Sequence, residues 1–236
     1  MIDDVEREIT KYIESYWRKE PDALVEALLR VVDPSLFRAL TKAIVSDRDM
    51  LDRAVRRSSI HNNGFLKIIL STSPQYQVRL HVWDCRPGED DAVQESVHSH
   101  TADFASMIVL GKYRHEQFRE VPDGETFHSY RYHASRGSRS FSLANTGVKY
   151  LQRISDQRLP KGTLYTLAGD ILHRVVPEPL VLTASLVIQG PPCYSFVQVF
   201  ADEPLNAGTE VPVRPLSIEK FVRYVDELLS DLTAFC

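Results

Sequence analysis

The sequence is poor in the features that mark secreted, membrane-spanning and nucleic-acid-binding proteins. It has three cysteines, Cys85, Cys193 and Cys236, which are odd in number and widely spaced. A disulfide framework is therefore not expected, and a reducing cytoplasm is the predicted compartment. No apolar run approaches the ~20 residues that a membrane span requires. The net charge is −4, so no basic field points to nucleic acid or to an anionic membrane.

The first residues, MIDDVEREITKY, lack the basic and apolar regions of a secretory signal, and no repeat or low-complexity tract interrupts the chain. What the chain does have is apolar material, because 43% of its 236 residues are hydrophobic. This length and composition favour one large all-β domain with additions over two complete domains.

Helices are predicted at both ends of the chain. Within residues 1–60, apolar side chains recur at helical spacing from Val5 to Tyr16, and Pro21 and Pro34 suit the first turns of two further helices. A fourth short helix is predicted for DRDMLDRAVRR. The C-terminal stretch LSIEKFVRYVDELLSDLTAF is also typical of a helix, with one apolar face made of Ile218, Phe221, Val222, Val225 and Leu228.

The middle of the chain is typical of β-structure. From Asn63 onward, short runs such as YQVRLHVW, FASMIVLGKYRHEQF, ETFHSYRYH and LVLTASLVIQ are separated by Pro, Gly, Asp and Ser. This pattern predicts an antiparallel sandwich or barrel. We therefore expect a helical extension over residues 1–60 packed on a β-barrel over 61–215, followed by a C-terminal helix over 216–236.

Two histidines separated by one residue raise the possibility of a metal site. Side chains at i and i+2 of a strand share a face, so His98 and His100 can aim both imidazoles at one point. A metal needs at least a third ligand. The segment LAGDILHRVV offers one, because Gly169-Asp170 makes a turn and His173 opens the next β run. A later antiparallel strand can return His173 beside the first pair.

These residues resemble the two motifs of the cupins. The likeness is carried by the HxH pair, by Gly111 after an apolar strand, and by the later G-D-x-x-H-x-V, with Trp83 ahead of the first motif and SLVIQGPP at the end. It is strongest toward the cysteine dioxygenase (thiol dioxygenase) branch and covers roughly Gly64 to Pro192. The resemblance implies a mainly β, double-stranded β-helix barrel that holds one metal, usually iron(II), through His98, His100 and His173. It also implies a possible homodimer.

The sequence departs from that branch at several positions. The region after HxH reads Phe104-Ala105 where most cupins carry a glutamate, which favours a three-histidine site. The family's Ser-x-His-x-Tyr strand keeps Ser185 but has Val187 and Gln189, so Ser185 and Gln189 are the candidate catalytic residues. Its carboxylate-binding arginine aligns best with Lys67, which is a candidate substrate-binding residue. These departures indicate a substrate other than cysteine, or a changed reaction.

Further polar residues near the motifs have functional and structural interpretations. Arg79 is a second candidate for substrate binding, although the apolar set of its strand predicts that Arg79 and His81 face outward. His115 is expected to be exposed. Asp103 is either a fourth ligand, a partner of a ligating histidine, or a turn residue. Lys67 is either a partner of a substrate carboxylate or a surface lysine on an edge strand.

The segment Tyr130–Ser140 contains three arginines, Arg131, Arg136 and Arg139, and has the composition of a loop. It is expected to be a solvated loop, or else a flexible lid that meets an anionic substrate.

The leading functional hypothesis is a non-haem iron(II) oxygenase that uses O₂ and a small anionic substrate, since three neutral ligands leave coordination positions open. A redox-neutral isomerase or lyase using zinc, nickel or manganese is the first alternative, because a three-histidine set also suits zinc. The second alternative is a non-catalytic cupin that binds a ligand or a partner protein.

Overall fold

The computed structural model describes residues 7, 10, 22–87, 95–134 and 139–233. Of the first predicted helix only Arg7 and Thr10 belong to this set, and both are helical. The helices that follow are α2 (Ala23–Val31), α3 (Pro34–Ser46), α4 (Arg48–Arg57) and, near the C-terminus, α5 (Ile218–Thr233). The predicted second, third, fourth and C-terminal helices are thus confirmed.

Aspartates fix where two of these helices begin. The Asp33 side chain accepts hydrogen bonds from the backbone N–H groups of Ser35 and Leu36, and Pro34 occupies the first turn of α3. Asp47 caps α4 in the same way through Met50 N–H. These caps satisfy amide donors that the first turn of a helix cannot pair internally.

The strands form two antiparallel sheets. The first sheet, in spatial order, contains β13 (Arg214–Pro215), β1 (Ser59–Ile60), β2 (Leu66–Thr72), β3 (Gln77–Asp84), β10 (Leu182–Gln189), β5 (Phe104–Leu110) and β8 (Leu164–Leu167). The second contains β11 (Val197–Ala201), β4 (Val97–His98), β9 (Leu172–Pro177), β6 (Lys112–Ala134), β7 (Ser140–Pro160) and β12 (Val211–Pro212).

The strand order defines the architecture. Along the chain from β3 to β10, successive strands alternate between the two sheets, except that β6 and β7 follow each other as a hairpin in the second sheet. One sheet therefore contains β3-β10-β5-β8 and the other contains β4-β9-β6-β7. This is the order of an eight-stranded jelly roll, the double-stranded β-helix of the cupins. The predicted fold class, a mainly β barrel with N-terminal helices and a C-terminal helix, is confirmed.

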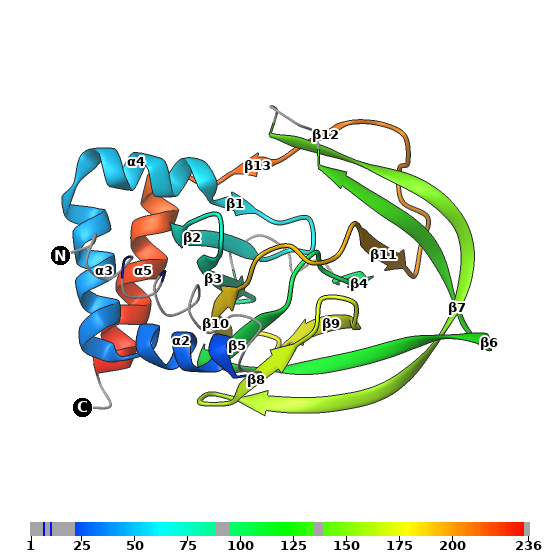
Figure 1. Ribbon diagram of the computed structural model, residues 1–236, viewed down its shortest axis with the longest axis horizontal. Coiled ribbons are helices and arrows are strands. Elements are labelled where there is room, and N and C mark those ends of the chain that lie inside the picture. Colours follow the sequence, from blue (N-terminus) through cyan, green and yellow to red (C-terminus); the bar gives the residue numbers. More distant parts are fainter. Residues whose placement is uncertain (1–6, 8–9, 11–21, 88–94, 135–138, 234–236) are drawn as a thin grey trace.

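The helices cover the outer face of the first sheet, on the left in Figure 1. Even-numbered residues of β3 and β10, such as Leu80 and Leu186, are fully buried there and share one apolar core with Leu28, Phe37 and Phe221 of the helices. Each such side chain contributes roughly 1.5–3 kcal/mol through burial. The odd-numbered residues of the same strands face the barrel interior, so both faces of this sheet are buried.

Two features differ from the sequence expectations. Strands β6 and β7 are 23 and 21 residues long and arc around the side opposite the helices (Figure 1), whereas the sequence predicted two shorter runs and no strand over residues 140–160. Register shifts at three points of the β6–β7 pair interrupt the period-two pattern. In α5, Ile218 lies on the predicted apolar face but is 37% exposed, while Phe221, Val225 and Leu228 are buried.

Candidate metal centre

Three histidines converge inside the barrel from two neighbouring strands of the second sheet. His98 ends β4, His100 follows two residues later, and His173 lies on β9. Strands β4 and β9 pair so that His98 is directly opposite His173, and directly opposed residues of an antiparallel pair share a face. Strand pairing therefore brings His100 and His173 together in space, although they are 73 residues apart in the sequence. We call His98, His100 and His173 the three-histidine cluster.

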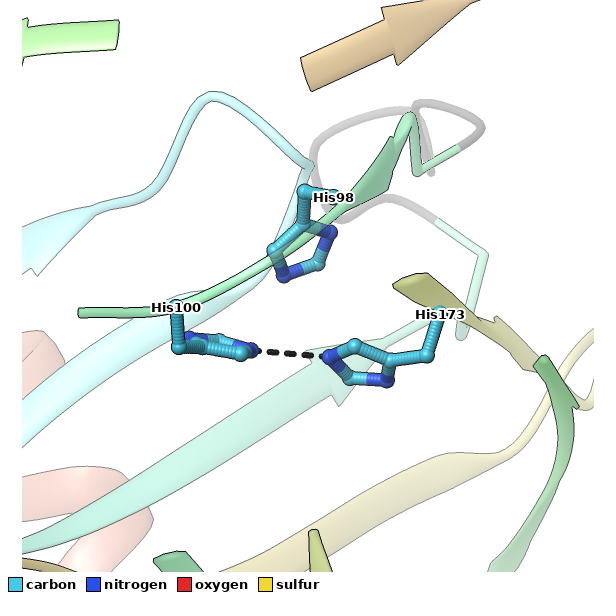
Figure 2. Close-up of side chains that lie close together, drawn as sticks. All are labelled: His98, His100 and His173. Carbon is cyan, nitrogen blue, oxygen red and sulfur yellow. Dashed lines mark hydrogen bonds between the residues drawn. The ribbon is translucent and has the colours of Figure 1, made fainter. Parts of the chain in front are cut away.

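The imidazoles point toward one another (Figure 2). The Nε2 atoms of His100 and His173 are 2.8 Å apart, and one candidate ligand atom from each of the three rings lies within 4.8 Å of the others. Two nitrogens bound at about 2.1 Å to one ion, at an angle of roughly 90°, would lie about 3 Å apart. His100 and His173 are thus spaced as two ligands of one divalent ion.

Burial keeps these rings in the neutral state that metal binding needs. It lowers the pKa of His100 and His173 well below the usual value, and the neighbouring histidines lower it further. Burial also lowers the pKa of His98, although a hydrogen bond to the Ser96 carbonyl acts in the opposite direction. Three neutral nitrogen donors in a buried site fit zinc, iron(II) or nickel.

Two of the rings have a hydrogen-bond partner on the nitrogen that faces away from the cluster. His98 Nδ1 lies 2.9 Å from the Ser96 carbonyl oxygen, and His173 Nδ1 lies 3.0 Å from Nε2 of His115. His115 was predicted to be exposed, and this prediction is wrong. The side chain has an exposed fraction of 3%, because it points into the barrel, where it contacts His173. Burial lowers the pKa of His115 to about 4.

The facing sheet carries one buried and one half-buried cationic side chain. Arg79 on β3 has an exposed fraction of 5%, and its charge lowers the pKa of His98 and His100. Lys67 on β2 is half-buried, and burial, followed by the nearby Arg79, lowers its pKa to about 7. The prediction that Arg79 and His81 face outward is wrong, since the outer face of β3 is taken by residues that pack on the helices.

Several buried nitrogen atoms on this inner face lack a hydrogen-bond partner among the described residues. They are Nε of Arg79, Nε2 of His81 and Nε1 of Trp83, which lie on alternate positions of β3. Buried polar atoms are normally hydrogen-bonded. The Phe65 ring packs against His81 and Trp83 with ring-centroid distances of 4.6 and 5.2 Å. The side chains of His81 and Trp83 therefore lie in an aromatic environment.

The two candidate catalytic residues lie on the same inner face. Ser185 is buried and stands directly opposite His81, which in turn stands opposite Lys67. The Gln189 side-chain oxygen accepts a hydrogen bond from Nη2 of Arg79. Lys67 lies on β2, between β1 and β3, and not on an edge strand.

Asp103 belongs to the loops that support the cluster. Its carboxylate accepts a hydrogen bond of 2.8 Å from Gly169 N–H, and its carbonyl accepts one of 2.9 Å from Gly190 N–H. It thereby connects the segment after His100 to the turn before His173. This geometry corresponds to the turn-residue interpretation.

The described part of the expected loop Tyr130–Ser140 is mostly strand. Residues 130–134 end β6, Ser140 begins β7, and residues 135–138, with Arg136, lie outside the described residues. Tyr130 is buried, and its hydroxyl accepts a hydrogen bond of 2.8 Å from Leu205 N–H. Arg131 lies over the Phe196 ring at 4.2 Å. The lid and loop interpretations are therefore wrong for the part that is described.

A sequence signal for His115 existed. Tyr113, a large aromatic residue, lies two residues earlier, so period-two alternation places both side chains on one face. The structure buries both of them. No comparable signal existed for Arg79, because its strand alternates apolar and polar residues as a half-exposed strand would.

Among the described residues, no helix is both long and apolar enough to span a membrane.

Comparison with known proteins gives only distant matches. No protein-family model and no curated protein matches the sequence. Among solved structures, the hydroquinone 1,2-dioxygenase PnpCD in complex with Cd²⁺ and 4-hydroxybenzonitrile aligns at 14% identity and a TM-score of 0.33, over 52% of this chain and 63% of that one. The hydroxypropylphosphonic acid epoxidase from S. wedmorenis aligns at 8% identity and a TM-score of 0.30, over 53% and 50%.

A conserved protein with a double-stranded β-helix domain from Klebsiella pneumoniae aligns at 12% identity and a TM-score of 0.33, over 65% of this chain and 95% of that one. The chain thus spans only half to two thirds of the length of the two enzymes. At this level of similarity nothing about activity follows, and the jelly-roll assignment depends on the strand order itself.

Proposed function

We propose that the protein is a metal-dependent oxygenase that combines O₂ with a small anionic substrate inside the barrel. The observation that carries this proposal is the convergence of the three-histidine cluster on one point, together with a buried Arg79 on the opposite sheet whose charge acts on His98 and His100. A divalent ion held by His98, His100 and His173, iron(II) in our proposal, would supply Lewis acidity and reactivity toward O₂.

The residues of the inner face would select the substrate. Arg79 and Lys67 supply positive charge in a region of low dielectric, where attraction for an anion is stronger than in water. Burial lowers the pKa of Lys67 to about 7, so a bound anion would draw a proton onto this amine at neutral pH. We further propose that Gln189 holds the Arg79 guanidinium in place and that Ser185 lines the same face.

Oxygen uptake tests this function. Protein loaded with iron(II) under anaerobic conditions is mixed with oxygenated buffer and a panel of thiols, amino acids and small oxoacids. We expect uptake with one anionic compound, its loss in His100→Ala, and a KM at least about tenfold higher in Arg79→Leu, because a buried charge partner has been removed. The exposed His133 on β6 gives the control His133→Ala, which should match the wild type.

The outcomes separate the alternatives. No oxygen uptake with any compound, in protein that carries stoichiometric iron, would contradict an oxygenase. Turnover of one of these compounds without O₂, supported by zinc, nickel or manganese, would favour a redox-neutral isomerase or lyase, because a three-histidine set suits these ions as well.

A further inference from the structure

His115 lies beside the three-histidine cluster without belonging to it. Strand β6 pairs with β9 so that His115 stands opposite Val175, two residues beyond His173. Residues two apart on a strand share a face, and such diagonal neighbours are within reach of long or aromatic side chains. The two rings do meet, with 3.0 Å between Nε2 of His115 and Nδ1 of His173.

The direction of this hydrogen bond depends on what the other nitrogen of His173 does. Its Nε2 faces the cluster, 2.8 Å from Nε2 of His100. A neutral imidazole carries one N–H group, so a His173 ring that offers the Nε2 lone pair to an ion carries its hydrogen on Nδ1. That hydrogen then points at His115, whose Nε2 must accept it.

His98 shows the same arrangement with a different acceptor. Its Nδ1 lies 2.9 Å from the Ser96 carbonyl oxygen, which can only accept a hydrogen bond. This contact is shorter than the 3.4 Å between Nδ1 and the Asn63 amide nitrogen, so it places the hydrogen of His98 on Nδ1 and leaves the Nε2 lone pair available. The hydrogen-bond partner of Nδ1 is thus a backbone carbonyl for His98 and a side chain for His173. Only the partner of His173 can be removed by mutation.

His115 is itself held in position. Its ring is almost fully buried, and it packs against the Tyr165 ring of β8 with a centroid distance of 5.0 Å. A ring confined in this way presents its acceptor nitrogen in one direction. This matters because orientation, as well as charge, determines how well an outer acceptor fixes a ligating imidazole.

We propose that His115 is a positioning residue that accepts the Nδ1–H of His173 and so keeps the Nε2 lone pair of His173 directed at the ion. The inference depends on the metal centre of the proposed function, but not on the oxygenase reaction. Outer acceptors of this kind typically change metal affinity by 10–100-fold.

Binding of Co²⁺ alone tests the proposal. Affinity is measured by competition with a chelator, and the visible absorption bands of the bound ion report the ligand geometry. His115→Leu fills a similar volume without an acceptor, whereas His115→Gln keeps an acceptor oxygen. The exposed His133 on the same strand supplies the control His133→Leu. Thermal unfolding of the metal-free proteins shows which variants remain folded.

We expect His115→Leu to bind Co²⁺ about 10–100-fold more weakly with altered bands. His115→Gln should recover most of the affinity, and His133→Leu should match the wild type. Unchanged affinity and bands in a folded His115→Leu would overturn the proposal, as would equal loss in Leu and Gln variants that are both folded. A folded wild type that binds no Co²⁺ would instead contradict the metal centre.

Discussion

Glu95 is a residue whose charge state depends on the fold. Its side chain is 3% exposed, and Oε2 accepts a hydrogen bond from Val175 N–H on β9. Burial raises the pKa of this carboxyl to about 8, against about 4.3 in an unfolded chain. The folded state therefore retains a proton that the unfolded state loses first.

The sign of the pH dependence follows from this difference. Stability from neutral Glu95 is fully present below pH ~4 and is lost as the pH rises through about 8. We expect Glu95→Gln, which keeps the acceptor oxygen, to be more stable than the wild type at pH 9, by up to about 5 kcal/mol. Denaturant unfolding at pH 6 and pH 9 measures this. The exposed Glu125 gives the control Glu125→Gln. An equal gap between Glu95→Gln and wild type at both pH values would contradict the account.

Strand spacing indicated that His98 and His100 share a face and offered His173 as a third ligand, and the resemblance to the cupin motifs implied the complete three-histidine set. These signals were not enough for Arg79 and His115. Whether a polar residue on an alternating strand is exposed depends on what covers that face, and for both residues the opposite sheet of the barrel covers it. Contacts between β3, β6 and the cluster join residues far apart in sequence.

At the scale of elements, the turn between β5 and β6 moves the chain from one sheet to the other. Gly111 occupies this turn with φ of +68°, a conformation that costs other residues roughly 1–2 kcal/mol. A Cβ added there would lie 2.6 Å from the Leu182 carbonyl oxygen of β10. Both the backbone angle and the close approach of β10 require glycine.

Gly111→Ala should therefore lower the free energy of unfolding by more than about 2 kcal/mol, since strain and a backbone clash add. Gly208 has a similar φ of +79° but nothing within 4 Å of an added Cβ. Gly208→Ala is the matched control, and we expect it to cost about 1 kcal/mol. Chemical denaturation compares the two. Equal losses would mean that the contact with β10 contributes nothing.

The long hairpin shows why element lengths were harder to predict than element types. In β7, Val148, Tyr150 and Ile154 are all exposed, so the strand lacks the apolar-in, polar-out alternation by which strands are recognised. Pairing with β6 over most of its length defines β7. Such pairing is a property of the two strands together, and the residue pattern of one strand alone does not reveal it.

At the scale of the whole molecule, the fold class could be predicted because motif spacing and punctuation agree with the jelly-roll order of strands. The helices cover the outer face of the first sheet, where Leu80 lies, and the inner face carries Arg79, whose charge acts on His98 and His100 of the three-histidine cluster. The outer face of the sheet therefore belongs to the apolar core, and the inner face carries polar residues.

The predicted domain limits at residues 60 and 215 stay predictions.

Metal content tests the central claim most directly. The wild type, the double variant His100→Ala/His173→Ala and the control His133→Ala are purified without chelator, reconstituted with iron(II) without oxygen, and analysed for bound metal. We predict about one ion per chain in the wild type and control, a higher unfolding temperature with metal in both, and loss of the ion in the double variant. A folded wild type without metal, or a double variant that retains a full equivalent, would contradict the account.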